Sequence, residues 1–247
     1  MIVVNRHIKI LLIDGIHKMK VALCLHGIVG TDDKYGKGEK IINYKIGYKH
    51  FKNHVIDVND RVDVFFHTWS VEREEKLKEI YDPVLYEAEE QPFFSDQPRR
   101  QATYCRWESF KKVINLVNSS GNEYDFVLVT RFDVAFLVDF EFEKYDNSKF
   151  YALGPPGPPL NNLSCINDFW FFANQKNMNK FANLFDFLDT NEYQPYIGSS
   201  HVLARKHLLE TGLENNIEYI FKREWTGPIG KLASDTPLVR WYYLNKV

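Results

Sequence analysis

Apolar runs alternate with apolar stripes along the first half of the chain. Three short runs, Val21–His26, Val62–Phe66 and Asp125–Thr130, are nearly continuous in apolar residues, which is typical of strands buried in a parallel sheet. Two stripes at spacings of three and four predict amphipathic helices between these strands, at positions 41, 44, 48, 51 and 55 and at positions 104, 107, 114 and 117. Strands that alternate with helices predict an α/β fold with a mostly parallel sheet and right-handed crossovers.

The second half of the chain is less regular. Strands are predicted at Phe150–Leu153 and Asp168–Ala173, separated by a stiff proline- and glycine-rich loop that begins at Gly154. Helices are predicted at positions 178 to 188 and over Ser200–Leu209, and a charge-dense exposed helix is predicted earlier, at Glu72–Glu79. No linker divides the halves, so we expect a single domain over residues 20–247, with residues 1–19 as an N-terminal extension or an extra strand.

Composition narrows the classes of function. The net charge is −2 and no basic block stands out, so nothing predicts nucleic-acid binding. No apolar run approaches the roughly 20 residues that a membrane-spanning helix needs. The three cysteines are widely spaced, which favours reduced thiols in a cytoplasmic protein, or in the host cytoplasm if the protein is viral. The oligomeric state is left open.

Polar groups follow each of the three apolar runs directly. Ligands of open parallel sheets bind beyond the carboxyl ends of the strands, so these positions are the predicted ligand site. After the first run, Gly27 and Gly30 would let the backbone approach a nucleotide, and His26 could contact its base or phosphate. The spacing matches neither a P-loop nor a dinucleotide fingerprint. The alternative is that His26 simply closes the strand.

The third run delivers Arg131 and Asp133 to the edge of the sheet. Alternation puts the two side chains on the same side of an extended chain. A carboxylate there can hold Mg²⁺ or Mn²⁺, and an arginine can pair with phosphate or with the carboxylate itself. A purely structural Arg–Asp pair that caps the strand is the alternative.

Several segments resemble GT-A glycosyltransferases, and most closely a group found in polysaccharide loci and large DNA viruses. Tyr124–Asp133 is similar to the DxD-type region of that group, in a variant that reads R-x-D. Asp63–Trp69 resembles its second strand and Ile166–Ala173 a later strand, while Tyr81–Pro83 and Gln101–Leu116 resemble the turn and the helix between them. The likeness runs in the family's order from about Lys20 to about Leu213.

The resemblance implies a GT-A-like, Rossmann-like fold, a nucleotide-diphosphate-sugar donor and a divalent metal, Mn²⁺ or Mg²⁺. It implies a nucleotide-binding half at residues 20–135 and an acceptor-side half at residues 136–247. Asp133 matches the metal ligand of the motif, and His201 could complete the metal site. Arg131 stands where the family has the first aspartate, which leaves two alternatives open: weaker metal dependence, or a metal held mainly by Asp133.

Further residues receive expected roles in such an enzyme. Asp168 is the candidate base for the acceptor hydroxyl, because a carboxylate usually takes that role. The donor would contact His67, Thr68 and Trp69 after the second strand. Arg99, Arg100 and Arg106 surround a predicted helix start, where anions bind readily, and Arg99 or Arg106 could reach the diphosphate. The structural alternatives are a strand cap for Asp168, a core tryptophan with a capping histidine, and ordinary surface arginines.

The sequence therefore predicts an enzyme that moves a sugar from a UDP- or GDP-sugar to a hydroxyl of a glycan acceptor, assisted by a metal at Asp133. A non-catalytic nucleotide- or carbohydrate-binding module on the same fold is the alternative. A phosphatase or nucleotidyltransferase is a third possibility, but it would need a second carboxylate beside Asp133, where Phe132 and Val134 stand.

Overall fold

One seven-stranded sheet forms the centre of the protein. The computed structural model describes residues 18–29, 44–153, 165–220 and 238–240. The strands lie in the order β3-β2-β1-β4-β7-β6-β8, with these bounds: β1 Lys20–Gly27, β2 Arg61–Thr68, β3 Leu85–Ala88, β4 Phe126–Arg131, β6 Phe150–Leu153, β7 Trp170–Ala173 and β8 Ile217–Ile220. Strands β3, β2, β1 and β4 are parallel, and β8 is parallel to β6. Strand β7 is antiparallel to both of its neighbours, β4 and β6.

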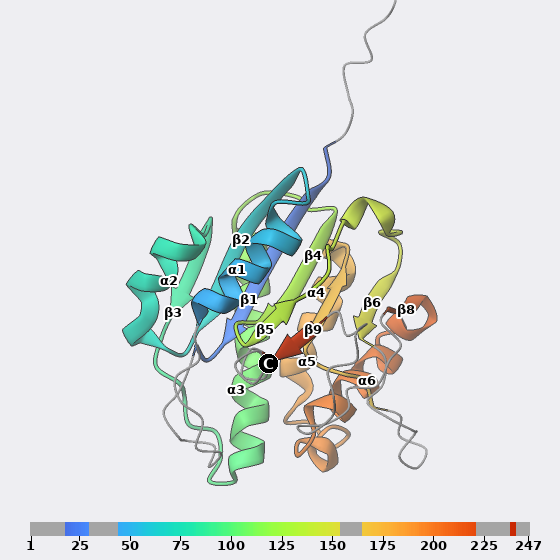
Figure 1. The fold of residues 1–247 in the computed structure, drawn as a ribbon. Helices are drawn as coiled ribbons and strands as arrows, with labels where there is room; N and C mark the ends of the chain where they lie inside the picture. The colour runs from blue at the N-terminus through green and yellow to red at the C-terminus, as the bar shows by residue number, and fades with distance from the viewer. Residues whose placement is uncertain (1–17, 30–43, 154–164, 221–237, 241–247) are drawn as a thin grey trace, which may run out of the picture.

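A second, two-stranded sheet follows directly from β4. Strand β5, Val134–Phe136, pairs antiparallel with β9, Leu238–Arg240. In Figure 1 these two strands lie in front of the lower part of the central sheet. Strand β9 therefore lies beside the segment that directly follows Asp133.

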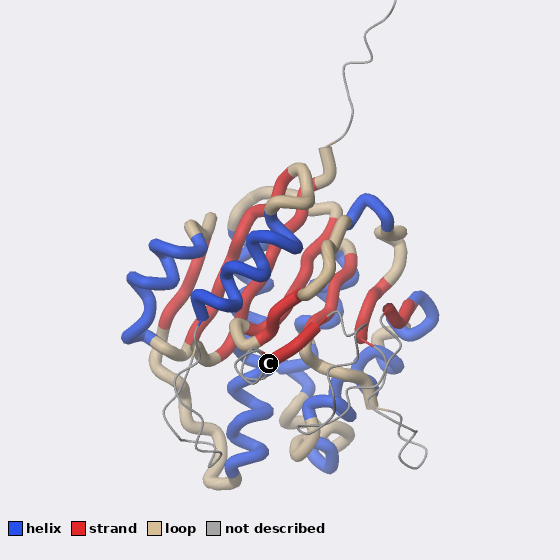
Figure 2. The backbone as a smooth tube through the Cα atoms, in the orientation of Figure 1, coloured by secondary structure: helices blue, strands red, loops and turns tan. Residues whose placement is uncertain are grey.

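Helices cover both faces of the central sheet, as the blue and red layers of Figure 2 show. The α-helices are α1 Tyr44–Phe51, α2 Glu74–Tyr81, α3 Pro98–Ser119, α4 Gln175–Ala182, α5 Leu184–Phe187 and α6 Ser200–Glu210. Five shorter helical segments are η1 Lys52–Ile56, η2 Val71–Arg73, η3 Phe142–Lys144, η4 Gln194–Tyr196 and η5 Leu213–Asn216. Helices α1 and α2 share one apolar core with the sheet, and α3 to α6 share the other.

Alternation along the strands explains the two cores. On β1, Ala22 and Cys24 face the core of α3, whereas Leu23 and Leu25 face the core of α1. All four side chains are fully buried, as expected for a central strand with helices on both sides. Strand β1 therefore reads as one continuous apolar run rather than an alternating one.

Most predicted elements are present, with differences at their ends. The stripe that begins at position 44 forms α1 and continues into η1, and the stripe at positions 178 to 188 divides into α4 and α5 at Asn183. The predicted Asp168–Ala173 strand begins two residues later, at Trp170. The short strands β3, β5, β8 and β9 were not predicted.

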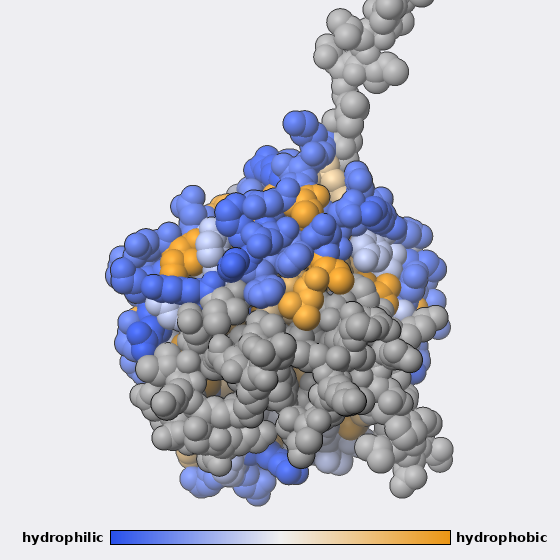
Figure 3. Space-filling model, viewed as in Figure 1, coloured by the Kyte–Doolittle hydropathy of each residue, from blue (hydrophilic) through white to orange (hydrophobic). Residues whose placement is uncertain are grey.

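The mostly parallel sheet flanked by helices confirms the predicted α/β class. The sheet runs through both halves of the chain, since β4 of the first half lies beside β7 of the second, so the described structure is a single domain. Most of the predicted extension, residues 1–17, lies outside the described residues. Within the described ranges, no helix is long and apolar enough to cross a bilayer. The surface over α1 and α2 is largely hydrophilic with scattered apolar patches (Figure 3).

Candidate functional site

The carboxyl ends of three parallel strands place predicted site residues side by side. In the strand register, His26 of β1 lies opposite His67 of β2 and opposite Arg131 of β4. Two positions before each of them stands an apolar residue of the core that includes α3, namely Cys24, Phe65 and Val129. Because side chains alternate along a strand, His26, His67 and Arg131 lie on the same side of the sheet as those residues. The sequence prediction that these strand ends meet at one edge is therefore confirmed.

Arg131 and Asp133 form an ion pair at the end of β4. Nη2 of Arg131 donates to Oδ2 of Asp133 over 2.5 Å. The Arg131 side chain is 26% exposed, whereas that of Asp133 is only 4% exposed. The two lie on the same side, as predicted, but a turn at Phe132 brings them together rather than an extended strand. Asp133 thus orients the guanidinium of a partly exposed side chain.

A second ion pair, between Arg106 and Asp168, links α3 to the segment before β7. Nε of Arg106 lies 3.3 Å from Oδ2 of Asp168, and its guanidinium also donates to the main-chain carbonyl of Asp168. Burial raises the pKa of Asp168, but the charges of Arg106, His201 and Arg131 outweigh it, and the pKa is lowered from its usual value. Asp168 is therefore an ionised, nearly buried carboxylate.

The arginines around α3 do not have the places expected from the sequence. Helix α3 begins at Pro98, so Arg106 lies in its third turn and contacts the site from the side of the helix. The argument that Arg106 binds anions through a helix start is wrong. Arg99 is in the first turn and exposed, and Arg100 donates to Oε1 of Gln194 over 2.5 Å. The arginines that pair with Asp168 and Asp133 are instead Arg106 and Arg131.

His201 lies beside Asp168 at the start of α6. Its Nδ1 is 3.4 Å from Oδ1 of Asp168 and 3.0 Å from the main-chain oxygen of Ile166. The main-chain nitrogen of Ile166 donates to the oxygen of His201 over 3.3 Å, so the two segments are joined in both directions. The structure thus joins His201 to the predicted base, Asp168.

His26 is enclosed by this group of charges. Burial lowers the pKa of His26 well below its usual value, and the positive charges of Arg106 and Arg131 lower it further. Its ring packs edge-on against Phe110 of α3, with centroids 5.4 Å apart. Among the described residues, Nδ1 of His26 has no hydrogen-bond partner. His26 is a neutral, buried imidazole at the centre of the cluster.

His67, Thr68 and Trp69 are buried and make hydrogen bonds to other residues of the fold. His67 lies between Ser109, at 2.7 Å from Nδ1, and Glu89, at 3.0 Å from Nε2. The indole of Trp69 donates to the main-chain oxygen of Cys105 over 3.1 Å. The hydroxyl of Thr68 accepts from the main-chain nitrogen of Ser70. These contacts match the structural alternative, a core tryptophan with a capping histidine, and through Ser109 and Cys105 they also join the segment to α3.

Gly27 is required by its backbone conformation. Its φ is +100°, a region that residues with a side chain rarely adopt, and its nitrogen donates to Oγ of Ser109 over 2.9 Å. Gly30 lies outside the described residues. Ser109 positions Gly27 and His67, and Ile166 positions His201. Neither was predicted as a site residue, because both are ordinary residues at these places in the sequence.

The residues around Asp133 do not form a metal-ligand set in the described structure. Arg131 occupies one of its oxygens, and a guanidinium beside a carboxylate opposes a second cation. Within the described ranges, the one group of three residues with ligand spacing is His67, Glu87 and Glu89, which includes neither Asp133 nor His201. The ammonium of Lys112 already pairs there with Glu89. The predicted metal at Asp133 and His201 therefore stays a prediction.

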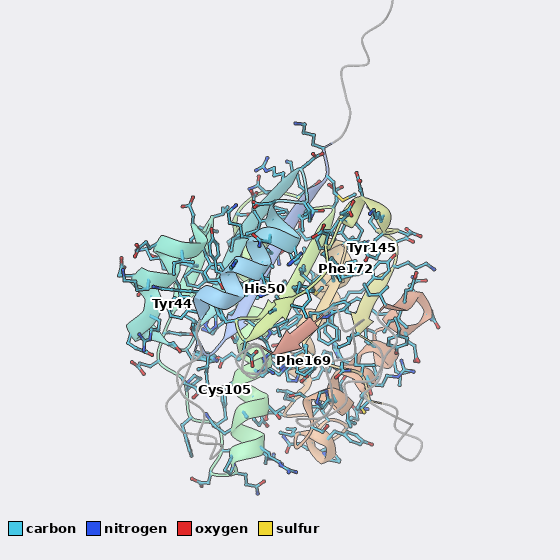
Figure 4. All side chains as sticks on the ribbon, viewed as in Figure 1. Tyr44, His50, Cys105, Tyr145, Phe169 and Phe172 are labelled. Carbon is cyan, nitrogen blue, oxygen red and sulfur yellow. The ribbon has the colours of Figure 1, made fainter. Side chains whose placement is uncertain are left out.

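Phe169 marks the edge of the site in Figure 4, at the lower end of the central sheet. Its main-chain oxygen accepts from Oγ1 of Thr130 over 3.2 Å, and its ring lies 6.0 Å from the guanidinium carbon of Arg131. A cavity of about 260 Å³ lies elsewhere, between α3 and α4, and is lined by lysines and asparagines that include Lys111, Asn115 and Lys180. None of the predicted site residues lines it.

Comparison with known proteins leaves the cluster to be interpreted from its own geometry. No protein-family model matches the chain, and no curated protein matches it. The two ion pairs and two histidines at the carboxyl edge of the sheet are therefore the basis for the functional argument.

Proposed function

We propose that the protein is a glycosyltransferase with a GT-A-like fold, which moves a sugar from a nucleotide-diphosphate sugar to a hydroxyl of a glycan acceptor. The observation that carries the proposal is the pair of arginines, Arg106 and Arg131, which come from separate elements to the carboxyl edge of β1 and β4. Both act electrostatically on His26 and on Asp168, so they share one site.

The arginines suit a diphosphate in the ground state and as a leaving group. A guanidinium has five donors in a planar fork, of which Arg131 uses one on Asp133, and the Arg131 side chain is 26% exposed. Negative charge grows on the diphosphate as the bond to the sugar breaks, and fixed positive groups stabilise that charge. Arg131 would contact the diphosphate directly, and Arg106 would add positive potential from behind.

Two further observations support the proposal. The mostly parallel sheet, with ligand-competent groups beyond the ends of β1 and β4, is the arrangement in which α/β proteins bind nucleotides. The segments that resemble the family, Tyr124–Asp133 and Ile166–Ala173, supply three of the clustered residues, namely Arg131, Asp133 and Asp168. The residues around Asp133 do not form a set of metal ligands in the described structure, so the proposal rests on the arginines and not on a metal.

A panel of nucleotide sugars tests the proposal by thermal shift and by transfer of sugar to glycan acceptors, with Mn²⁺ or with EDTA. A ligand at about 100 times its Kd stabilises the folded state by about 2.7 kcal/mol, which raises Tm by roughly 5–10 °C in a protein of this size. We expect such a shift with at least one UDP- or GDP-sugar, and its loss in Arg131→Met. Arg61→Met is the matched control, because Arg61 begins β2 at the opposite end of the strand. No shift with any nucleotide would refute the proposal.

A binding module without catalysis is the second candidate. Both carboxylates of the cluster are nearly buried and paired with arginines, which favours a structural role for them. In that case the nucleotide sugar raises Tm but is never consumed, with or without an acceptor. Turnover in the same panel separates the two candidates.

A further inference from the structure

Asp168 is poorly placed to take a proton from a substrate itself. Its side chain is 7% exposed, and Arg106 holds both its carboxylate and its main-chain oxygen. The charges around it lower its pKa, which makes the carboxylate a weaker base. The group that faces solvent next to Asp168 is His201, whose side chain is 40% exposed.

The contacts of His201 fix which ring nitrogen carries the proton. Nδ1 lies near two oxygens that can only accept, the carbonyl of Ile166 and the ionised carboxylate of Asp168. In the neutral ring Nδ1 is therefore protonated, and the lone pair is on Nε2. General-base histidines likewise have Nδ1–H held by an acceptor, which leaves the lone pair on Nε2. In His201 that acceptor is the carbonyl of Ile166, and the carboxylate of Asp168 lies beside it.

The surrounding charges keep this arrangement in place. Asp168 faces His201 from the segment before β7, while Arg106 of α3 and Arg131 of β4 hold Asp168 ionised. The backbone bond from Ile166 to His201 fixes the start of α6 relative to the same segment. The ring is thus oriented by two elements, and the carboxylate stabilises the imidazolium that forms when Nε2 takes a proton.

We propose that His201 is the base that takes the proton from the acceptor hydroxyl and that Asp168 is a positioning residue for its ring. This inference rests on the proposed glycosyltransferase activity. The acceptor oxygen forms its bond to the anomeric carbon as its proton passes to Nε2 of His201. The bond between that carbon and the diphosphate oxygen breaks, and its electron pair leaves with the nucleotide diphosphate. His201 then releases the proton to water.

The experiment measures sugar transfer and tautomer state in the full chain, in EDTA to exclude effects of metal ligation. We expect His201→Ala to lower kcat by 100-fold or more with KM for the nucleotide sugar within about threefold, in the range of general-base catalysis. Added imidazole should restore part of kcat in His201→Ala. Leu209→Ala, an exposed position in the same helix, is the control and should leave kcat unchanged.

Asp168 is tested with a readout that a merely structural role would not move. Nitrogen-15 NMR of the ring should show Nδ1–H in the wild type, and the Ile166 carbonyl should keep that tautomer in Asp168→Asn. The imidazolium loses its neighbouring carboxylate in that variant, so kcat should fall with KM for the nucleotide sugar unchanged, and Asp168→Glu should restore part of kcat. Wild-type transfer with full activity in His201→Ala would overturn the role of His201 and leave the proposed function standing. An Nε2–H tautomer in the wild type would also overturn it. Absence of transfer by the wild type on every donor and acceptor, with Mn²⁺ as well as in EDTA, would refute both proposals.

Discussion

Arg106 and Asp168 form an ion pair that joins the helical layer to the end of the central sheet, with Nε of the arginine 3.3 Å from Oδ2 of the aspartate. Arg106 lies in the third turn of α3, and Asp168 lies two residues before β7. Both side chains are largely buried, at 11% and 7% exposure. A buried pair of this kind contributes little net stability, but removing one partner leaves a charge without compensation.

Replacement of Arg106 by methionine should therefore destabilise the protein strongly. We expect the free energy of unfolding to fall by about 3–5 kcal/mol, measured by urea denaturation at pH 7. Lys111→Met in the same helix is the matched control, since the Lys111–Asp186 pair is partly exposed and worth about 1 kcal/mol or less. The double variant Arg106→Met with Asp168→Asn should recover part of the loss. Equal losses in Arg106→Met and the control would show that the pair is not desolvated.

Acid should destabilise the protein through its buried histidines. Burial lowers the pKa of His67 and of His207 to about 4, below the value of about 6.5 in an unfolded chain. Their contribution is complete above about pH 6.5 and is lost as pH falls toward 4, because only the unfolded chain binds their protons in that window. At pH 5 each histidine should cost about 2 kcal/mol relative to pH 7.5.

The variant His207→Gln isolates one of these contributions. Its free energy of unfolding, from urea titrations at several pH values, should fall less steeply between pH 6.5 and 5 than that of the wild type. Leu209→Gln, at an exposed position in the same helix, removes no titrating group and should keep the wild-type slope. Identical slopes in wild type and His207→Gln would mean that His207 takes up its proton over the same pH range in the folded and the unfolded state.

Alanine at Gly47 should push α1 away from the turn that carries Asp133. A Cβ at this position would lie 2.9 Å from the main-chain oxygen of Phe132, and a backbone carbonyl cannot move aside cheaply. Alanine normally stabilises a helix relative to glycine by about 1 kcal/mol. Here we expect a net loss of about 1–3 kcal/mol in the free energy of unfolding, as in other overpacked sites.

The matched control for Gly47→Ala is Lys49→Ala, an exposed substitution in the same helix that should change stability by less than about 0.5 kcal/mol. Thermal denaturation of the two variants side by side is sufficient. A stabilised Gly47→Ala protein would mean that α1 does not approach Phe132 as closely as described.

Removal of the Ser109 hydroxyl should leave two buried groups without a partner. Oγ of Ser109 accepts from the nitrogen of Gly27 and lies 2.7 Å from Nδ1 of His67. An unsatisfied buried polar group costs about 1–3 kcal/mol, so Ser109→Ala should lower the free energy of unfolding by at least that amount in urea denaturation. Ser119→Ala at the exposed end of the same helix should have little effect. Equal midpoints for both variants would argue against the described hydrogen-bond chain.

The sequence alone determined the elements that depend on local periodicity. The apolar runs of β1, β2 and β4 and the stripes of α1 and α3 follow from which residues can be buried at spacings of two or of three and four. The same local reasoning placed Arg131 and Asp133 at the end of a buried strand, at the carboxyl edge of the sheet. These features need only neighbours in the chain, so the printed sequence was sufficient.

Only the tertiary structure decided which polar residues meet and which are open to solvent. Strand β7 inserts antiparallel between β4 and β6, and that order brings Asp168 to Arg106 of α3 and to His201 of α6. The tertiary structure also buries His67 against Ser109 and leaves the side chain of His201 40% exposed. The local sequence around the two histidines does not show this difference. Periodicity fixes the face on which a side chain lies but carries no information on strand order, and contacts between distant segments depend on that order.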